Sequence, residues 1–285
     1  MPDIQQVSVV RRLCYHPNVR TSAVFVLLVC LWGPAGAHAQ DLIAEARRLY
    51  NARDYEEAER VARAALAVPE TVNSARVVFG RIQLERYRQS AAPEHLAEGR
   101  ASLRDADPGL LNPRERVELT LGFAETLFLE DRFSAAAELF EPAVDASARL
   151  NLPEHDRVLD WWATALDRYA QTRPLQERAE IYRRITRRMT AELARNIASV
   201  PPGYWLVASA RGSGDLEGAW SSAMANWVRA ALAPDRGAAL RGDLDRLMVQ
   251  AIIPDRAARL ASKDTTAVIT GLLAEWESFK AGWAK

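Results

Sequence analysis

The feature that most constrains the fold of this chain is a set of small and large apolar residues that recurs at one spacing in two segments. Steps of three and four residues keep side chains on one face of a helix, and a step of six spans a tight turn. The spacing therefore predicts two copies of a helical hairpin whose small residues let its helices approach closely. In both copies the six positions are separated by 3, 6, 3, 4 and 3 residues: Ala46, Leu49, Tyr55, Ala58, Ala62 and Ala65, then Ala124, Leu127, Phe133, Ala136, Phe140 and Ala143.

Helical patterns continue along the rest of the chain, and most of them end at a proline or a short polar turn. No sustained alternation of β-branched residues suggests strands, and the abundant Ala, Leu, Arg and Glu favour helix. We expect an all-α fold of about five helix pairs followed by C-terminal capping helices. The expected segments are 41–50 and 55–68, 75–88 and 95–103, 113–129 and 133–147, 155–170 and 175–198, 204–210 and 216–232, then 238–252, 254–262 and 267–283.

The turns of the two copies also agree, because an aromatic residue begins the second helix in Arg53-Asp54-Tyr55 and in Asp131-Arg132-Phe133. With this pattern the chain resembles the tetratricopeptide repeat family over residues 41–147, and less closely over 155–232. Its pairs start about 40 residues apart instead of about 34, so another α-solenoid or a non-repeating bundle remains an alternative. The weaker copy, which Asn226 interrupts, consists of Val207, Ala210, Leu216, Ala219 and Ala223.

The resemblance implies a curved stack of hairpins, a tetratricopeptide-like α-solenoid, whose concave groove binds proteins or peptides. In that register the groove residues are Ile43, Arg47 and Tyr50 in the first copy and Leu121, Glu125 and Phe128 in the other. The alternative is that these side chains form ordinary surface or pack between repeats. The paired lysines and asparagines with which some family members hold a terminal carboxylate do not recur here.

The first 39 residues are typical of a bacterial-type secretory signal peptide. A basic lead with Arg11, Arg12 and Arg20 precedes an apolar run at 23–32, and an Ala-X-Ala ending follows. We expect cleavage between Ala39 and Gln40, and an exported product in the periplasm or outside the cell. The run is shorter than the roughly 20 residues that cross a bilayer, so no membrane span should remain, and a retained anchor is the alternative.

Beyond the leader we expect tetratricopeptide-like repeats over residues 40–200, and a weaker repeat with C-terminal helices over 201–285. Pro201-Pro202-Gly203 would be a hinge or a stiff turn between them. Removing the leader takes three arginines and one aspartate from 37 basic and 37 acidic residues, so the remaining net charge is about −2. This balance argues against a nucleic-acid partner, which usually requires a basic surface.

Residues for catalysis or metal binding are scarce, and we expect no enzyme and no cofactor. Both cysteines, Cys14 and Cys30, lie in the leader, and only His95 and His155 remain beyond it. Neither histidine has metal-ligand spacing, and His155 at a helix start is expected to be exposed. Neither a phosphate-binding loop nor a nucleophile elbow is present.

Two clusters leave alternatives open. The basic cluster Arg183, Arg184, Arg187 and Arg188 lies off the apolar stripe of its helix, where Glu180 can pair with Arg184; it is either a solvated face or a surface for an anionic partner. Tryptophans gather in the second half, where Trp276 and Trp283 share an apolar stripe typical of a core. The favoured hypothesis is a scaffold or adaptor that binds a protein or peptide. The alternatives are an envelope glycan-binding or enzyme-accessory module using these tryptophans, and a metal-independent hydrolase.

Overall fold

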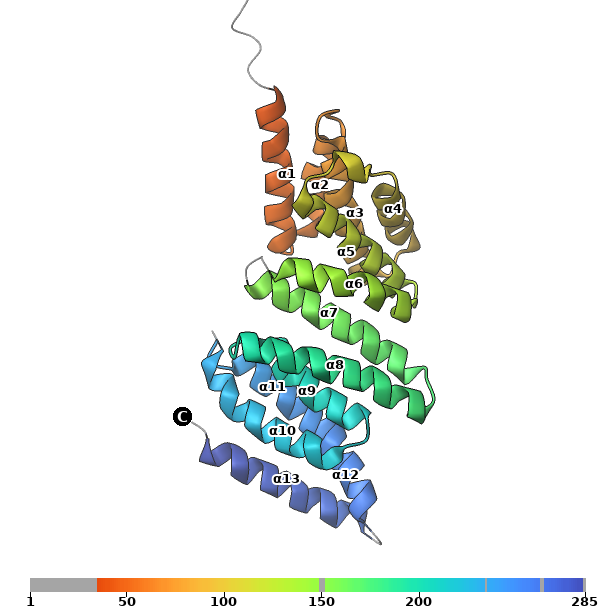
Figure 1. Ribbon diagram of the computed structural model, residues 1–285. Coiled ribbons are helices and arrows are strands. Elements are labelled where there is room, and N and C mark those ends of the chain that lie inside the picture. The colour runs from red at the N-terminus through yellow and green to blue at the C-terminus, as the bar shows by residue number, and fades with distance from the viewer. Residues whose placement is uncertain (1–34, 149–151, 234, 262–263, 284–285) are drawn as a thin grey trace, which may run out of the picture.

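The computed structural model describes residues 35–148, 152–233, 235–261 and 264–283, and every regular element in these ranges is a helix (Figure 1). The all-α prediction is confirmed for this part of the chain. The helical hairpins are α1 (Ala35–Asn51) with α2 (Tyr55–Leu66), α3 (Val72–Ser90) with α4 (Pro93–Arg104), α5 (Pro113–Leu129) with α6 (Phe133–Ser147), α7 (Leu152–Gln171) with α8 (Leu175–Arg195), and α9 (Val200–Gly212) with α10 (Leu216–Arg229). The C-terminal helices are α11 (Ala238–Leu247), a π-helical turn (Met248–Ile252), α12 (Ile253–Leu260) and α13 (Thr265–Gly282), and short 3-10 turns lie at Pro108–Leu110 and Ala230–Leu232.

In Figure 1, α1 to α5 lie at one end of the molecule, α6 and α7 in the middle, and α8 to α13 toward the other end. Each of α1 to α9 packs against the next helix in the chain. In addition, odd-numbered helices pack on one another: α1 on α3, α3 on α5, α7 on α9 and α9 on α11. The odd-numbered helices thus pack side by side within α1, α3 and α5 and within α7, α9 and α11, and the cavities described below lie mainly among these helices.

The turns that the sequence matched have the same local structure. Arg53 and Asp131 both adopt a left-handed backbone with φ near 60°, and Gly214 takes this place in the weaker copy, between α9 and α10. In each turn the next residue donates its N–H to a carbonyl five residues earlier, at 3.0 Å in the first hairpin and 2.8 Å in the other two. Tyr50–Tyr55 and Phe128–Phe133 then bring two rings together across the turn, with centroids 5.6 and 5.3 Å apart.

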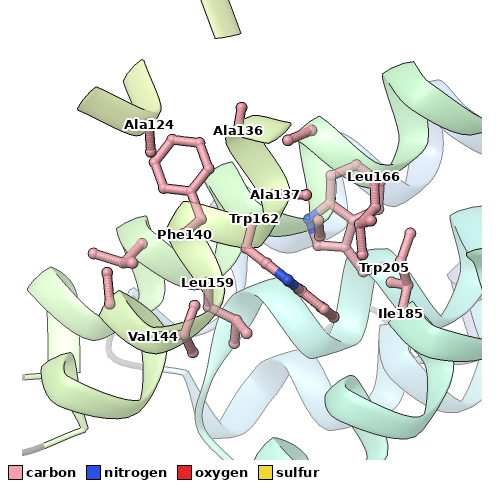
Figure 2. Packing of buried hydrophobic residues seen from close by; sticks show 14 of the residues in the cluster. Ala124, Ala136, Ala137, Phe140, Val144, Leu159, Trp162, Leu166, Ile185 and Trp205 are labelled. Atoms are coloured by element: carbon pink, nitrogen blue, oxygen red, sulfur yellow. The ribbon is translucent and has the colours of Figure 1, made fainter. Parts of the chain in front are cut away.

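The small residues of the matched pattern lie in the core, where they let the helices approach. Ala46, Ala58, Ala62 and Ala65 are fully buried, and so are Ala124, Ala136 and Ala143 of the later copy. Phe140 stands where the first copy has Ala62, and Figure 2 shows its ring beside Ala124. The same cluster takes Trp162 from α7, Ile185 from α8 and Trp205 from α9, so it joins three hairpins.

Glycines allow the closest helix contacts, where α3, α4 and α5 meet around the buried side chain of Leu103. A Cβ added to Gly80 would lie 2.6 Å from Leu103 Cγ and 3.1 Å from the carbonyl oxygen of Gly99. A Cβ added to Gly122 would lie 2.7 Å from Leu103 Cδ2. Real side chains do not tolerate such separations without a shift of their neighbours, so these glycines set the spacing of the three helices.

Pro201 and Pro202 form neither a hinge nor a turn outside the helices. They are buried in the first turn of α9, which begins at Val200, because proline lacks only an N–H that has no helical partner there. The domain boundary expected at residues 200 and 201 thus falls within a helix. The predicted leader falls mainly on residues 1–34, outside the described residues, and the expected cleavage point between Ala39 and Gln40 lies on α1. None of the described helices is long and apolar enough to span a membrane.

Candidate binding site on the odd-numbered helices

The first cavity lies among α1, α3, α5 and α7 and has a volume of about 300 Å³. Its apolar walls come from Val78 on α3, Val117 and Leu121 on α5, and Val158 and Trp161 on α7. Charged side chains complete the lining: Arg47, Arg81, Arg114, Glu118, Glu154 and Arg157. A small apolar recess with a few placed charges is the usual composition of a ligand site in proteins.

Arg47 fixes the position of α1 against α5 at the wall of this cavity. Its guanidinium donates to Glu118 at 2.9 and 3.1 Å and to Glu115 at 3.1 Å. Glu115 is itself held by a capping box with Asn112 at the start of α5. Burial opposes ionisation of Glu115, but the Asn112 N–H, Ser74 and Arg47 outweigh it and lower the pKa. The carboxylate therefore stays charged, and Arg47 is oriented by groups that belong to the fold.

Arg81 on α3 closes the wall between α1 and α5. It donates to the buried Glu125 at 3.0 Å and to the Tyr50 hydroxyl at 3.1 Å, and its guanidinium lies over the Tyr50 ring. Burial raises the pKa of Tyr50 above its usual range, so the hydroxyl is neutral. Burial alone would lower the pKa of Arg81, but Glu125 and Tyr50 outweigh it and raise that pKa. Removing one member of such a pair usually costs about 3–5 kcal/mol.

The adjacent residues Trp161 and Trp162 on α7 point in different directions, one to the first cavity and the other to the core. Trp162 is fully buried in the core, whereas Trp161 is half-buried and lines the first cavity. Arg88 lies over the Trp161 ring at 5.2 Å, and Phe140 packs near it with ring centroids 6.0 Å apart. The indole therefore has a fixed orientation on the cavity wall.

A second cavity of about 660 Å³ lies among α7, α9 and the α11 region. Three carboxylates line it, those of Asp156, Asp160 and Asp243. Burial raises the pKa of Asp156 and of Asp160, although Ser199 donates to Asp156 at 2.6 Å and Trp205 Nε1 to Asp160 at 2.8 Å. Asp243 forms an ion pair with Arg246, which also lines the cavity. The second cavity is therefore more acidic than the first.

Arg157 on α7 lines both cavities and so lies where they adjoin. Its charge lowers the pKa of Tyr55 and Glu85, against the larger effect of burial, which raises both. It makes no hydrogen bond or ion pair with another residue of the described chain. In contrast, Arg47, Arg81 and Arg114 each bind at least one carboxylate. Arg246 of the second cavity is paired with Asp243, so among the described cations that line the two cavities Arg157 is the one without a bound carboxylate.

The chain matches no protein-family model, and no curated protein or solved structure is significantly similar to it. A function for this chain is therefore inferred from the geometry of these two cavities.

The structure brings three of the six expected groove residues to the first cavity, namely Arg47, Tyr50 and Leu121. The other three do not line it. Ile43 packs in the core of the first hairpin, Glu125 is fully buried, and Phe128 packs against the cluster around Phe140 and Trp162. Residues at equivalent positions of two hairpins differ in exposure, because each hairpin packs against a different neighbour.

Four further residues that line the first cavity lie outside the predicted groove: Arg81, Glu118, Arg157 and Trp161. A signal for Arg157 was present, since it lies four residues before Trp161 on the same helical face.

The predicted anion face does not consist of free cations, because its four arginines have carboxylate partners. Arg184 binds Glu138 and Glu141 on α6, and Arg188 binds Asp145 and Glu192. The expected pair of Glu180 with Arg184 is wrong; Glu180 instead pairs with Arg183 at 2.7 Å and Arg187 at 3.6 Å. Arg184 and Arg188 thus connect α8 to α6, where the carboxylates of the preceding hairpin lie within reach.

His155 is buried, and the expected exposed position is wrong. Its Nδ1 lies 2.9 Å from Ser147 Oγ, and its Nε2 lies 3.1 Å from Glu192. A serine, a histidine and a carboxylate can form a nucleophilic site, but such a serine must be reachable, and Ser147 is completely buried. His95 contacts Gln83 at 2.7 Å. The described residues contain no cluster of three or more His, Cys, Asp or Glu side chains that could hold a metal ion.

The tryptophans of the second half mostly pack inside the protein. Trp276 is fully buried and contacts Trp220 and Trp227, which confirms the core role expected for it. The prediction that Trp283 belongs to the core is wrong, because Trp283 follows the end of α13 and is 51% exposed. Among the described residues it is the one tryptophan with a largely exposed ring. A sugar-binding platform requires at least two exposed, coplanar rings, so this surface does not favour the glycan hypothesis.

Proposed function

We propose that this chain is a non-enzymatic, exported scaffold or adaptor that binds segments of other proteins along its odd-numbered helices. In this proposal the hairpins form a tetratricopeptide-like α-solenoid, and the side that carries the two cavities is its concave groove. The leader directs the protein to the periplasm or the exterior.

The observation that carries this proposal is that the two cavities adjoin at Arg157 and are lined mainly by the first helices of successive hairpins. Together they draw on α1, α3, α5, α7, α9 and α11, which gives a recess along the molecule and not a single deep pocket. Such an extended surface suits a chain segment with several side chains, whereas a substrate pocket for catalysis usually converges on one point.

Site-specific photo-crosslinking tests the proposal. Benzoylphenylalanine is placed at Asn51, an exposed residue at the end of α1 that lines the first cavity. The control position is Gln89 near the end of α3, which is also exposed but lines neither cavity. We expect irradiation of cells that export the protein to give discrete protein adducts at position 51 and not at position 89. No adducts at position 51, or the same adducts at both positions, would contradict the proposed groove.

A further inference from the structure

If the proposed function holds, the apolar walls and the charges of the first cavity indicate which kind of peptide segment binds there. We propose that it binds an extended peptide segment in which a bulky apolar side chain is followed or preceded, within two residues, by Asp or Glu. The apolar side chain enters the cavity, and the carboxylate binds Arg157.

The apolar side chain of the proposed peptide segment is inferred from the size and walls of the cavity. A volume of about 300 Å³ lies at the small end of ligand sites, which suits one or two side chains and not a folded domain. Val78, Val117, Leu121 and Val158 surround the space, and the Trp161 ring, held by Arg88, forms one side. An aliphatic or aromatic side chain buries apolar area against all of them, at roughly 25 cal/mol per Å².

The acidic residue of the proposed peptide segment is inferred from which arginines of the cavity already have a carboxylate partner. Arg47 and Arg81 are held by carboxylates of α5, and Arg114 by Glu118 and Glu154, so these three cations are already neutralised. Arg157 has no such partner in the described chain and is exposed beside the cavity. A guanidinium binds a carboxylate through two parallel, charge-assisted hydrogen bonds, which adds both affinity and geometry.

The spacing of the two ligand groups follows from α7. Arg157 and Trp161 are separated by one helical turn, so their side chains are neighbours on one face about 5–6 Å apart. In an extended peptide, side chains two residues apart point the same way and lie about 7 Å apart. A segment along the groove can therefore reach the cavity and Arg157 with residues two positions apart, which lies within the window of two residues proposed above.

The second cavity restricts where the carboxylate can lie. Beyond Arg157 the surface carries three carboxylates, those of Asp156, Asp160 and Asp243, and of these Asp243 forms an ion pair with Arg246. A further carboxylate there would be repelled. The acidic residue of the ligand is consequently confined to the neighbourhood of Arg157, and an acidic run that extends past it should bind less tightly.

The test begins with a phage-displayed library of random dodecapeptides, selected on protein produced from the full sequence. We expect enriched peptides to carry Asp or Glu within two residues of a Leu, Ile, Met, Phe or Trp. The best peptide, labelled with fluorescein, should lose affinity by about tenfold or more on Arg157→Glu. Arg168→Glu is the matched control, because Arg168 is exposed on the same helix and lines neither cavity, so affinity should stay within about twofold.

A charge exchange separates recognition from damage to the fold. The same peptide with Lys in place of its acidic residue should bind Arg157→Glu more tightly than the wild type. Enriched peptides without an acidic residue, or peptides whose binding ignores Arg157→Glu, would overturn this inference and leave the proposed function intact. If no peptide is enriched over a selection without protein, the inference and the proposed peptide groove both fail.

Discussion

Replacing Gly80 by alanine should show how strongly the hairpins depend on close helix contacts. The new Cβ would lie 2.6 Å from Leu103 Cγ, and Leu103 is fully buried, so either α4 or the Leu103 side chain must shift. Overpacking of a core costs typically 1–3 kcal/mol, and the higher helix propensity of alanine returns about 1 kcal/mol. We expect Gly80→Ala to lower the free energy of unfolding by up to about 2 kcal/mol.

Urea unfolding followed by far-ultraviolet circular dichroism measures this change, and two further variants complete the experiment. Gly242→Ala makes the same chemical change on α11, where a new Cβ has no neighbour within 4 Å, and it should stabilise the protein by about 0.5–1 kcal/mol. Leu103→Ala should cost about 2–5 kcal/mol. In the double variant the new methyl group occupies space that Leu103 vacates, so the two costs should not add. Strict additivity, or a Gly80→Ala as harmless as Gly242→Ala, would refute the packing argument.

Three further substitutions test other contacts. Burial alone would raise the pKa of Asp245, but hydrogen bonds from Lys280 and Trp276 outweigh it and hold that pKa below its ordinary value of 3.8. The resulting stabilisation of the fold is complete above pH 3.8 and is lost as the pH falls below it. Asp245→Asn should therefore reduce the loss of stability at acidic pH, measured as unfolding followed by tryptophan fluorescence. His155→Leu removes two buried hydrogen bonds and should lower the free energy of urea unfolding by about 1–3 kcal/mol; an unchanged midpoint would show that these bonds contribute nothing. Arg184→Gln should cost about 1 kcal/mol or less and leave retention on a heparin column unchanged, whereas clearly weaker retention would restore the anion-face hypothesis.

The sequence predicted the helices well because their signals are local. Proline, capping residues and spacings of three or four place the ends of α5 and α6 at the residues expected. The turns at Arg53 and Asp131 were recognisable because the same short pattern surrounds both. The start of α9 differs from the prediction, because two consecutive prolines are typical of a break, whereas here both fit the first turn of a helix.

The candidate site was predicted only in part, because its geometry depends on pairs far apart in the sequence. Arg47 binds carboxylates 68 and 71 residues away, and Arg81 binds Glu125 across 44 residues. A register on a single helix cannot reveal such partners. For this reason Glu125, which has the same register as Arg47, lies buried against Arg81 of the preceding hairpin, whereas Arg47 reaches the cavity.

The helices around the first cavity belong to four separate hairpins, and this division has a mechanical consequence. A small rotation of one hairpin against the next changes the width of the recess, so an occupant that touches α1 and α7 together resists bending of the whole N-terminal half. Occupancy should therefore be detectable far from the ligand, as slower amide hydrogen exchange in α2 and α4, which line no cavity. In this way a short peptide could stiffen more than a hundred residues of chain, and a pulling force could release it.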